Sequence, residues 1–165
     1  MSSLTFKQVA PSDISFLMDI YNHFVVHSTY SFHTEPVALP EFTESVIHAN
    51  PRYQTYVILL DEIPQGYVQV MPHKKKQAYD TTGEVTIYLH PECVGKGIGS
   101  ASIQYVEAIA KERGFHSLIA TVCADNSASI HMFTRNGYEQ CAYYREVGFK
   151  WGKFLDIVTF QKIIS

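Results

Sequence analysis

Apolar positions recur along the chain at two different spacings, and together these spacings predict an α+β fold. Apolar residues at helical spacing, Leu17 and Ile20 among them, predict a helix over residues 11–28 with Ser12 or Asp13 as its N-cap. Short runs rich in β-branched and aromatic residues predict strands over residues 4–10, 55–61, 63–72, 83–91 and 116–123. The order of these elements favours one mixed sheet flanked by helices over a pair of βαβαβ halves.

The rest of the pattern completes this prediction. The other expected elements are a helix over residues 39–51 closed by Pro51, a hairpin turn over residues 61–65, a helix ending at Arg113, a short helix over residues 126–136, and final strands within residues 138–162. No linker, repeat or low-complexity block interrupts the chain. Residues 1–165 are therefore expected to form a single domain.

Composition and charge narrow the classes of function. The 165 residues suffice for a full hydrophobic core, and a net charge of -3 gives no reason to expect nucleic acid as a partner. We find no apolar run long enough to cross a bilayer and no secretory signal, so no membrane partner is expected. Three cysteines without metal-ligand spacing, Cys93, Cys123 and Cys141, indicate reduced thiols in a cytoplasmic protein.

The stretch VGKGIGS, residues 94–100, lies between a predicted strand and a predicted helix. Glycines let a backbone approach a diphosphate closely, and the start of a helix adds the positive end of its dipole. We therefore expect an anion to bind at this turn. Two alternatives are a plain tight turn and the dinucleotide fingerprint G-x-G-x-x-G/A of a nucleotide-dependent oxidoreductase. The fingerprint belongs to the first strand and helix of its fold, and here the motif comes after about ninety residues.

The same stretch resembles motif A of the GNAT superfamily of acetyltransferases, which binds the pyrophosphate of acetyl-CoA. Four longer segments, IYNHFVVHSTYSFHTEP, KKQAYDTTGEVTIYLHPE, NSASIHMFTRNGY and EVGFKWGKFLDIVTFQ, resemble the phosphinothricin and methionine sulfoximine acetyltransferases. The resemblance covers nearly the whole chain. It implies the GNAT fold, a mixed and mostly antiparallel central sheet in which a splayed strand pair binds acetyl-CoA as co-substrate. One departure is Val94, which stands where the family usually has Arg or Gln.

The resemblance also implies which residues contact acetyl-CoA. Backbone groups of one strand would pair with the pantetheine arm, the glycine loop would hold the diphosphate, and the asparagine of an N-x-x-S pattern would bond the arm. The implied residues are Ile87, Tyr88, Leu89, Gly95, Lys96, Gly97, Ile98, Gly99, Ser100, Asn126 and Ser129. The residues themselves also favour Asn126 as a helix N-cap, and both roles are compatible.

Acetyl transfer to an amine requires a base, because only the neutral amine attacks a thioester. Glu84 opens the strand that leads to the glycine loop, and strand alternation places it on one face with Thr86 and Tyr88. The residues alone allow a solvated acid at this position, whereas the resemblance implies that Glu84 is the base. Many family members use a tyrosine as general acid, but Phe133 stands at that position. We therefore expect the proton of the leaving thiol to come from solvent.

A small amino-acid-like substrate carries a carboxylate, so a cation is expected near it. Lys74 and Lys76 precede the strand of the expected base, and Lys76 stands where the resembled subfamily has the arginine of an R-x-A-Y pattern that includes Tyr79. Phe32 and Thr34 match a loop that walls the substrate pocket in the subfamily. The alternatives are a solvated basic hairpin tip for the lysines and ordinary loop packing for Phe32 and Thr34.

The expected function is the N-acetylation of a small amine such as phosphinothricin or methionine sulfoximine. Acetylation of a protein or peptide amine and a non-catalytic acyl-CoA-binding module are the alternatives. His23 and His27 are a possible ligand pair, but we find no third ligand at a suitable spacing, so no metal is expected. The resemblance implies a homodimer, for which the aromatic C-terminal segment would supply an interface.

Overall fold

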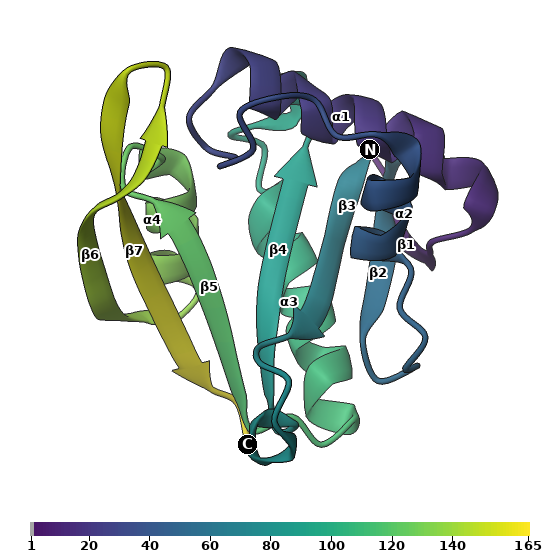
Figure 1. The fold of residues 1–165 in the computed structure, drawn as a ribbon. Coiled ribbons are helices and arrows are strands. Elements are labelled where there is room, and N and C mark those ends of the chain that lie inside the picture. The colour runs from purple at the N-terminus through teal and green to yellow at the C-terminus, as the bar shows by residue number, and fades with distance from the viewer. Residues whose placement is uncertain (1) are drawn as a thin grey trace.

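The computed structural model describes residues 2–165, and a seven-stranded sheet forms its centre (Figure 1). The strands are β1 (Leu4–Gln8), β2 (Gln54–Leu60), β3 (Ile63–Pro72), β4 (Thr82–Leu89), β5 (Ser117–Cys123), β6 (Glu139–Lys150) and β7 (Lys153–Ile163). The helices are α1 (Ile14–His27), α2 (Leu39–Val46), α3 (Ile98–Glu112) and α4 (Ser127–Arg135), with short 3-10 turns η1 (Pro11–Asp13), η2 (Gln77–Tyr79) and η3 (Pro91–Cys93).

The strand order is β1-β2-β3-β4-β5-β7-β6. Every neighbouring pair is antiparallel except β4 and β5, which are parallel. The prediction of a mixed, mostly antiparallel sheet within an α+β fold is therefore confirmed. The parallel pair arises because α3 connects β4 to β5 as a crossover.

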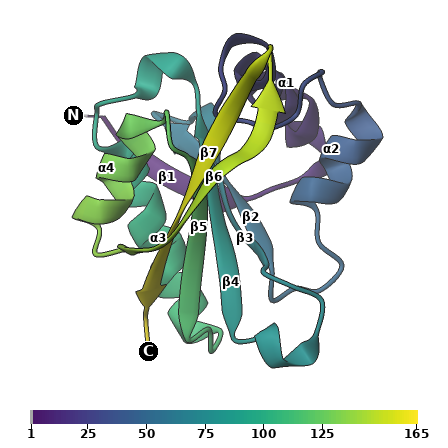
Figure 2. The ribbon, with the colours of Figure 1, turned by 60° about the vertical axis from the view of Figure 1, so that its left-hand side comes forward.

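Helices cover both faces of the sheet, with α3 and α4 on one side and α1 and α2 on the other (Figure 2). Successive residues of β2 serve the two faces, because Val57 packs in the cluster with Leu17 of α1 and Phe42 of α2, whereas Ile58 packs in the cluster with Ile103 of α3. Both strand residues are fully buried. The central strands are thus covered on both sides, which accounts for their nearly continuous apolar sequence.

Two predicted boundaries are wrong. The second helix ends at Val46 and does not reach Pro51, because the Val46 carbonyl accepts the Thr55 hydroxyl at 2.7 Å and the next residue, Ile47, is extended. The hairpin turn consists of Asp61 and Glu62 alone, and residues 63–65 belong to β3.

The short hairpin turn has a conformational cause. Asp61 and Glu62 both adopt positive φ, 50° and 68°, which is the combination that joins two twisted antiparallel strands with a two-residue loop. Asp61 also exchanges hydrogen bonds with the N-terminal segment, because its carboxylate accepts the Ser3 N–H at 2.7 Å and its own N–H donates to the Ser3 carbonyl at 2.8 Å. These contacts stabilise a conformation that aspartate and glutamate seldom adopt.

Asp13 is the N-cap of α1, one of the two predicted candidates, but its carboxylate makes no capping bond to the helix. Instead it accepts the Ala10 N–H at 2.8 Å and the Lys7 ammonium at 2.9 Å. The side chain therefore fixes the turn between β1 and the helix.

Lys150, the last residue of β6, is only 2% exposed. Its ammonium donates to the carbonyl oxygens of Val25, Ser28 and Ser31 at 2.8, 2.9 and 2.9 Å. Burial lowers the pKa of this ammonium, since the protein interior solvates charge less well than water. The three bonds join the β6–β7 hairpin to the end of α1 and to the loop that follows it.

Replacing Lys150 with Met should leave three carbonyl groups without their donor. We expect Lys150→Met to lower the free energy of unfolding by about 2 kcal/mol or more, measured by urea denaturation. The matched control is Lys153→Met, because the Lys153 side chain is 64% exposed and pairs with the exposed Asp125 at 3.2 Å. That control should change stability by less than about 1 kcal/mol. Equal losses in the two variants would contradict the role given to Lys150.

Candidate functional site

The parallel contact between β4 and β5 is short. The strands are in register only at Thr82–Ser117, Gly83–Leu118 and Glu84–Ile119, and they then diverge (Figure 1). Beyond this point, no strand of residues 2–165 pairs with the β5-facing edge of β4. The backbone N–H and C=O groups along that edge are therefore available to a ligand.

The divergence does not come from fraying of either strand. Strand β4 remains paired with β3 along its length, from Pro72–Gly83 to Gly66–Leu89. Strand β5 remains paired with β7 from Ser117–Ile163 to Cys123–Ile157. Each strand is thus held by its outer neighbour while the two inner edges separate.

A cavity of about 880 Å³ lies in this opening, a volume typical of small-molecule sites. Its lining comes from both sides of the divergence and from the two helices that follow the separating strands. The main contributors are Val85–Leu89 of β4, Cys93–Gly95 with Gly97, Gly99 and Ser100, Thr121–Cys123 of β5, Asn126–Ser129, and His131–Phe133 with Arg135 of α4. Phe24 of α1 and Tyr30 of the next loop complete it.

The glycine loop forms the wall of this cavity at the C-terminal end of β4. Gly95 and Gly97 adopt positive φ, 84° and 77°, and Gly97 is the N-cap of α3. A Cβ at either position would meet no atom within 4 Å, so the backbone conformation and the open space beside it explain these glycines. The unpaired N–H groups of the first turn of α3 make this a site for an anion.

Gly99 has a different role, although it lines the same cavity. A Cβ at this position would lie 2.6 Å from the sulfur of Met132. Gly99 therefore lets α3 pack closely against α4, which carries Met132.

Two charged or titratable side chains of the cavity were missed by the sequence prediction. His131 and Arg135 lie four residues apart on α4, hence on one helix face, and both line the cavity with the glycine loop. Their spacing was visible in the sequence. Their place in the same cavity as the loop depends on how α4 packs against α3, and the spacing alone did not indicate it.

Asn126 lines the cavity and caps α4, because its side-chain oxygen accepts the Ser129 N–H at 3.2 Å. The amide NH₂ remains available to a ligand. Two other predicted residues lie outside the lining: the side chain of Ile98 is buried in the core, and Lys96 is exposed.

Glu84 belongs to the last register pair before β4 and β5 diverge, directly before the lining residues Val85 and Thr86. The predicted alternation is confirmed. Val85 packs in the cluster with α3, whereas Tyr88 packs against the cluster with α1 and α2. Glu84 and Thr86 therefore share the α1 and α2 side of β4 with Tyr88.

One contact of Glu84 was not predicted from the sequence. Nδ1 of His73 lies 2.8 Å from Oε1 of Glu84, and the two side chains are 19% and 26% exposed. His73 follows Pro72, which is opposite Gly83 in the β3–β4 register. The antiparallel pairing thus brings His73 to the first residues of β4.

Of the tyrosines, Tyr30 and Tyr88 line the cavity within the described part of the chain. Burial raises the pKa of the Tyr88 hydroxyl well above its ordinary value, and the neighbouring Tyr21 adds to this shift. Tyr143 is exposed on β6, where its hydroxyl donates to Asp156 at 2.5 Å. Phe133 is buried and lines the cavity at the position where the resemblance implied a tyrosine.

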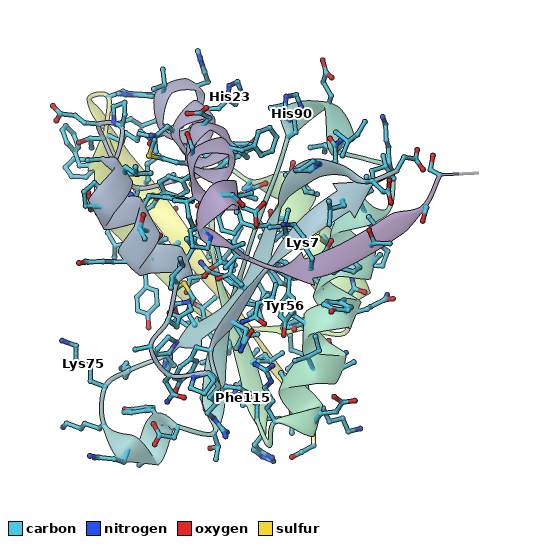
Figure 3. All side chains as sticks on the ribbon, turned by 90° about the vertical axis from the view of Figure 1, so that its right-hand side faces the viewer. Lys7, His23, Tyr56, Lys75, His90 and Phe115 are labelled. Atoms are coloured by element: carbon cyan, nitrogen blue, oxygen red, sulfur yellow. The ribbon has the colours of Figure 1, made fainter. Side chains whose placement is uncertain are left out.

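The predicted basic residues lie beyond the closed end of the opening. Figure 3 shows Lys75 at the opposite end of the sheet from His90, which precedes the glycine loop. The Lys74 ammonium lies 5.4 Å from the ring centre of Tyr79, and the Tyr79 ring lies edge-on to His73 at 5.5 Å. Lys74 and Tyr79 are thereby connected to Glu84 through His73.

Lys76 is exposed at the start of η2, and its carbonyl accepts the Tyr79 N–H at 3.0 Å. Its ammonium makes no hydrogen bond or ion pair with any part of residues 2–165. Phe32 lies against Gly148 of β6, since a Cβ there would meet its ring at 2.5 Å, and Thr34 is exposed. Neither Phe32 nor Thr34 lines the cavity.

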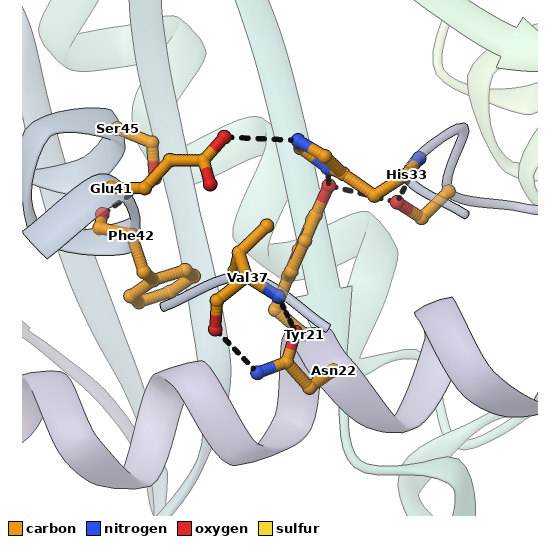
Figure 4. Close-up of polar contacts among 8 residues, drawn as sticks. Tyr21, Asn22, His33, Val37, Glu41, Phe42 and Ser45 are labelled. Atoms are coloured by element: carbon orange, nitrogen blue, oxygen red, sulfur yellow. Dashed lines mark hydrogen bonds and ion pairs between the residues drawn. The ribbon is translucent and has the colours of Figure 1, made fainter. Parts of the chain in front are cut away.

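The loop that carries Phe32 is fixed by a polar network (Figure 4). The Ser31 hydroxyl donates to the Tyr21 hydroxyl at 2.8 Å, and the Tyr21 hydroxyl also bonds Nδ1 of His33. Nε2 of His33 lies 3.4 Å from Glu41 of α2. This network anchors the loop to both α1 and α2, next to the Tyr88 end of the site.

None of the helices in residues 2–165 has the length and apolar character needed to span a membrane. No group of three His, Cys, Asp or Glu side chains in that range is arranged to hold a metal ion. The rings of His23 and His27 lie 4.7 Å apart, and the three cysteines are free.

Comparisons with a family model and with curated relatives all identify acetyltransferases. Residues 17–138 match the model of the acetyltransferase (GNAT) family. The chain is 33% identical to a phosphinothricin N-acetyltransferase of Streptomyces coelicolor, covering 94% of this chain and 95% of the relative. It is 25% identical to an L-methionine sulfoximine/L-methionine sulfone acetyltransferase of Salmonella typhimurium, covering 96% and 93%.

A solved structure extends this comparison. It is a GNAT superfamily phosphinothricin acetyltransferase from Sinorhizobium meliloti in complex with AcCoA. It superposes on this chain with a TM-score of 0.91 at 25% identity, covering 98% of this chain and 89% of the other.

Proposed function

Because the chain belongs to the acetyltransferase (GNAT) family, we propose that it transfers the acetyl group of acetyl-CoA to the amine of a small amino-acid-like substrate, such as phosphinothricin or methionine sulfoximine. The observation that carries the proposal is the opening between β4 and β5, with a glycine loop at its wide end. Glu84 does not line the cavity itself, but it is in the last register pair at the closed end, directly before the lining residue Val85. The activities named for the relatives support the substrate class. The single sheet supports one catalytic domain over residues 1–165.

Backbone groups would supply most contacts to acetyl-CoA. The free edge of β4 at residues 87–89 would pair with the pantetheine arm as an added strand would. The N–H groups of the glycine loop and of the first turn of α3 would hold the diphosphate. Val94 brings no charge to this loop, so we assign the cationic contact to Arg135, with His131 beside it on α4.

The side chains of the opening would complete this binding site. The Ser100 hydroxyl accepts the Asn136 amide at 3.0 Å, which directs its own hydrogen toward other acceptors such as a phosphate oxygen. The Asn126 NH₂ group would donate to the arm, since its oxygen is already used as a cap.

Glu84 would act as the general base. It would take a proton from the substrate ammonium, and the electron pair left on nitrogen would attack the thioester carbonyl. A backbone N–H of the free β4 edge would stabilise the oxyanion, and loss of the thiolate, protonated by solvent, would complete the transfer. The position of Glu84, where the two strands part, supports this assignment.

Replacing Gly97 with Asn tests the acetyl-CoA site. Asn tolerates positive φ better than most residues, so the loop should keep its conformation while a side chain fills the space beside it. Acetyl-CoA affinity, measured by calorimetry, should fall at least about tenfold, since 1.4 kcal/mol of lost binding suffices. The matched control is the same substitution at Gly114, which has φ of 82° and no atom within 4 Å of a Cβ. Gly114 lies beyond α3, outside the cavity lining, so acetyl-CoA affinity should not change there. Unchanged affinity in a folded Gly97→Asn variant would contradict the assignment.

Replacing Glu84 with Gln tests the chemistry. At neutral pH, kcat should fall by about 10²–10⁴-fold, the usual contribution of a general base, while acetyl-CoA affinity stays constant. The loss should shrink as pH rises, because more of the substrate amine is then already neutral. Release of free thiol with a panel of amino acids and analogues measures this effect. Glu112→Gln, on the exposed end of α3, should have full activity.

A small loss that does not vary with pH would assign the base to another group. Thiol release with peptides but with none of the amino acids would replace the proposed substrate class by a protein or peptide amine.

We also propose a homodimer formed through the outer part of the β6–β7 hairpin, the hairpin surface. This surface lies at the β6 edge of the sheet (Figure 1) and exposes large apolar side chains, which lone domains seldom display together. Its members are Val147, Phe149, Trp151 and Phe154, each 57–60% exposed.

Light scattering after size-exclusion chromatography checks the proposed dimer. Phe154→Glu should place an uncompensated charge in the interface and yield monomers at concentrations where the unmodified chain is dimeric. Ile63→Glu, at an equally exposed position on the β2–β3 hairpin, should remain dimeric. A monomeric unmodified chain, or dissociation by both substitutions, would rule out this interface.

A further inference from the structure

His73 contacts the proposed base Glu84, but it has no role in the acetyl-transfer mechanism described above. Nδ1 of His73 lies 2.8 Å from Oε1 of Glu84, within ordinary hydrogen-bond distance, and both side chains are mostly buried. Glu84 lies in β4 and His73 directly follows the end of β3, and the two meet because β3 and β4 are paired up to Pro72–Gly83. The contact therefore depends on the sheet and not on a flexible loop alone.

The direction of the bond follows from the role of Glu84, so the inference rests on the proposed function. A carboxylate that is to accept a proton has no hydrogen of its own and can only accept hydrogen bonds. Nδ1 of His73 must then carry the hydrogen and donate it to Oε1. Oε2 remains without this partner and is the oxygen that can take a proton from the substrate.

The His73 ring is held from the other side as well. The Tyr79 ring lies edge-on to it at an interplanar angle of 71°, and the Lys74 ammonium lies over the Tyr79 ring. Another histidine, His48 in the segment between α2 and β2, contacts Gln69 of β3, which is opposite Thr86 in the register. Of the polar side chains in this region, His73 is the one that contacts the Glu84 carboxylate directly.

We propose that His73 is a positioning residue for Glu84, which holds the carboxylate so that Oε2 faces the substrate amine. In the proton transfer, the N–H bond of the ammonium breaks, its electron pair stays on nitrogen, and the proton binds Oε2. Oε1 then becomes the carbonyl oxygen of the neutral acid. It can still accept from Nδ1, so the same hydrogen bond orients the group before and after the step.

The hydrogen bond from His73 explains how the Glu84 carboxylate can be held in one orientation although its side chain has three rotatable bonds. A free glutamate would sample several rotamers, and few would direct an oxygen at the amine. A misplacement of about 1 Å can reduce a rate about 100-fold, so one orienting bond is enough to matter.

Three variants test the proposal. His73→Phe removes the donor and keeps a planar ring, and we expect kcat to fall at least about tenfold while KM for acetyl-CoA stays constant. His73→Asn is the conservative variant, because its side-chain NH₂ can reach Oε1 in place of Nδ1, and it should restore most of the kcat. His27→Phe, on the exposed end of α1, is the control for loss of a histidine and should be fully active.

A double-mutant cycle with Glu84→Gln separates positioning from a general structural role. If His73 acts through Glu84, His73→Phe should lower kcat in the unmodified chain but not in the Glu84→Gln background. An equal loss in both backgrounds, or a His73→Asn variant as impaired as His73→Phe, would overturn the proposal. If His73→Phe does not fold, His73→Ala enters the same cycle.

The base assignment of Glu84 and the positioning role of His73 fail in different ways. Full activity of Glu84→Gln would remove the base itself and, with it, the role of His73. A strongly impaired Glu84→Gln together with a fully active His73→Phe would leave the base in place and overturn only the positioning role.

Discussion

The site depends on one constraint, namely that β4 and β5 pair over only three residues. A longer parallel ladder would use the inner backbone groups of both strands and fill the space of the cavity. A complete separation would leave no fixed closed end. The observed pairing stops at Glu84, so the last position with a rigid partner carries the proposed base. The backbone groups of β4 that we assign to acetyl-CoA lie beyond that point, on a strand whose other edge is held by β3.

Contacts from outside the sheet keep the walls of the opening in place. The Lys150 ammonium holds the end of α1 and the next loop, which contribute Phe24 and Tyr30 to the cavity. Gly99 lets α4 approach α3, and that approach brings Arg135 into the same cavity. Such contacts give the site its shape without touching the proposed ligand. The Lys150 contact buries a charge, which is unfavourable unless its three carbonyl acceptors all stay in place.

The features that sequence could predict are those with local causes. Strand alternation placed Glu84, Thr86 and Tyr88 on one face, and the glycines marked the turn before α3, because both patterns are set by neighbouring residues. The boundaries of α2 and of the β2–β3 turn were wrong because tertiary partners, a Thr55 hydroxyl and the Ser3 backbone, decide them. The His73–Glu84 contact required the β3–β4 register, which periodicity does not specify.

The difference between backbone and side-chain roles accounts for which parts of the site tolerate substitution. The proposed binding through backbone groups depends on φ, ψ and strand spacing, so it does not require a charged side chain at Val94. Proton transfer has no such freedom, because it needs a particular oxygen at a particular place. In the proposed mechanism, Glu84 is therefore the point at which a side chain cannot be replaced by backbone. His73 reaches Glu84 from the end of the neighbouring strand β3, and we expect it to set the orientation of that carboxylate.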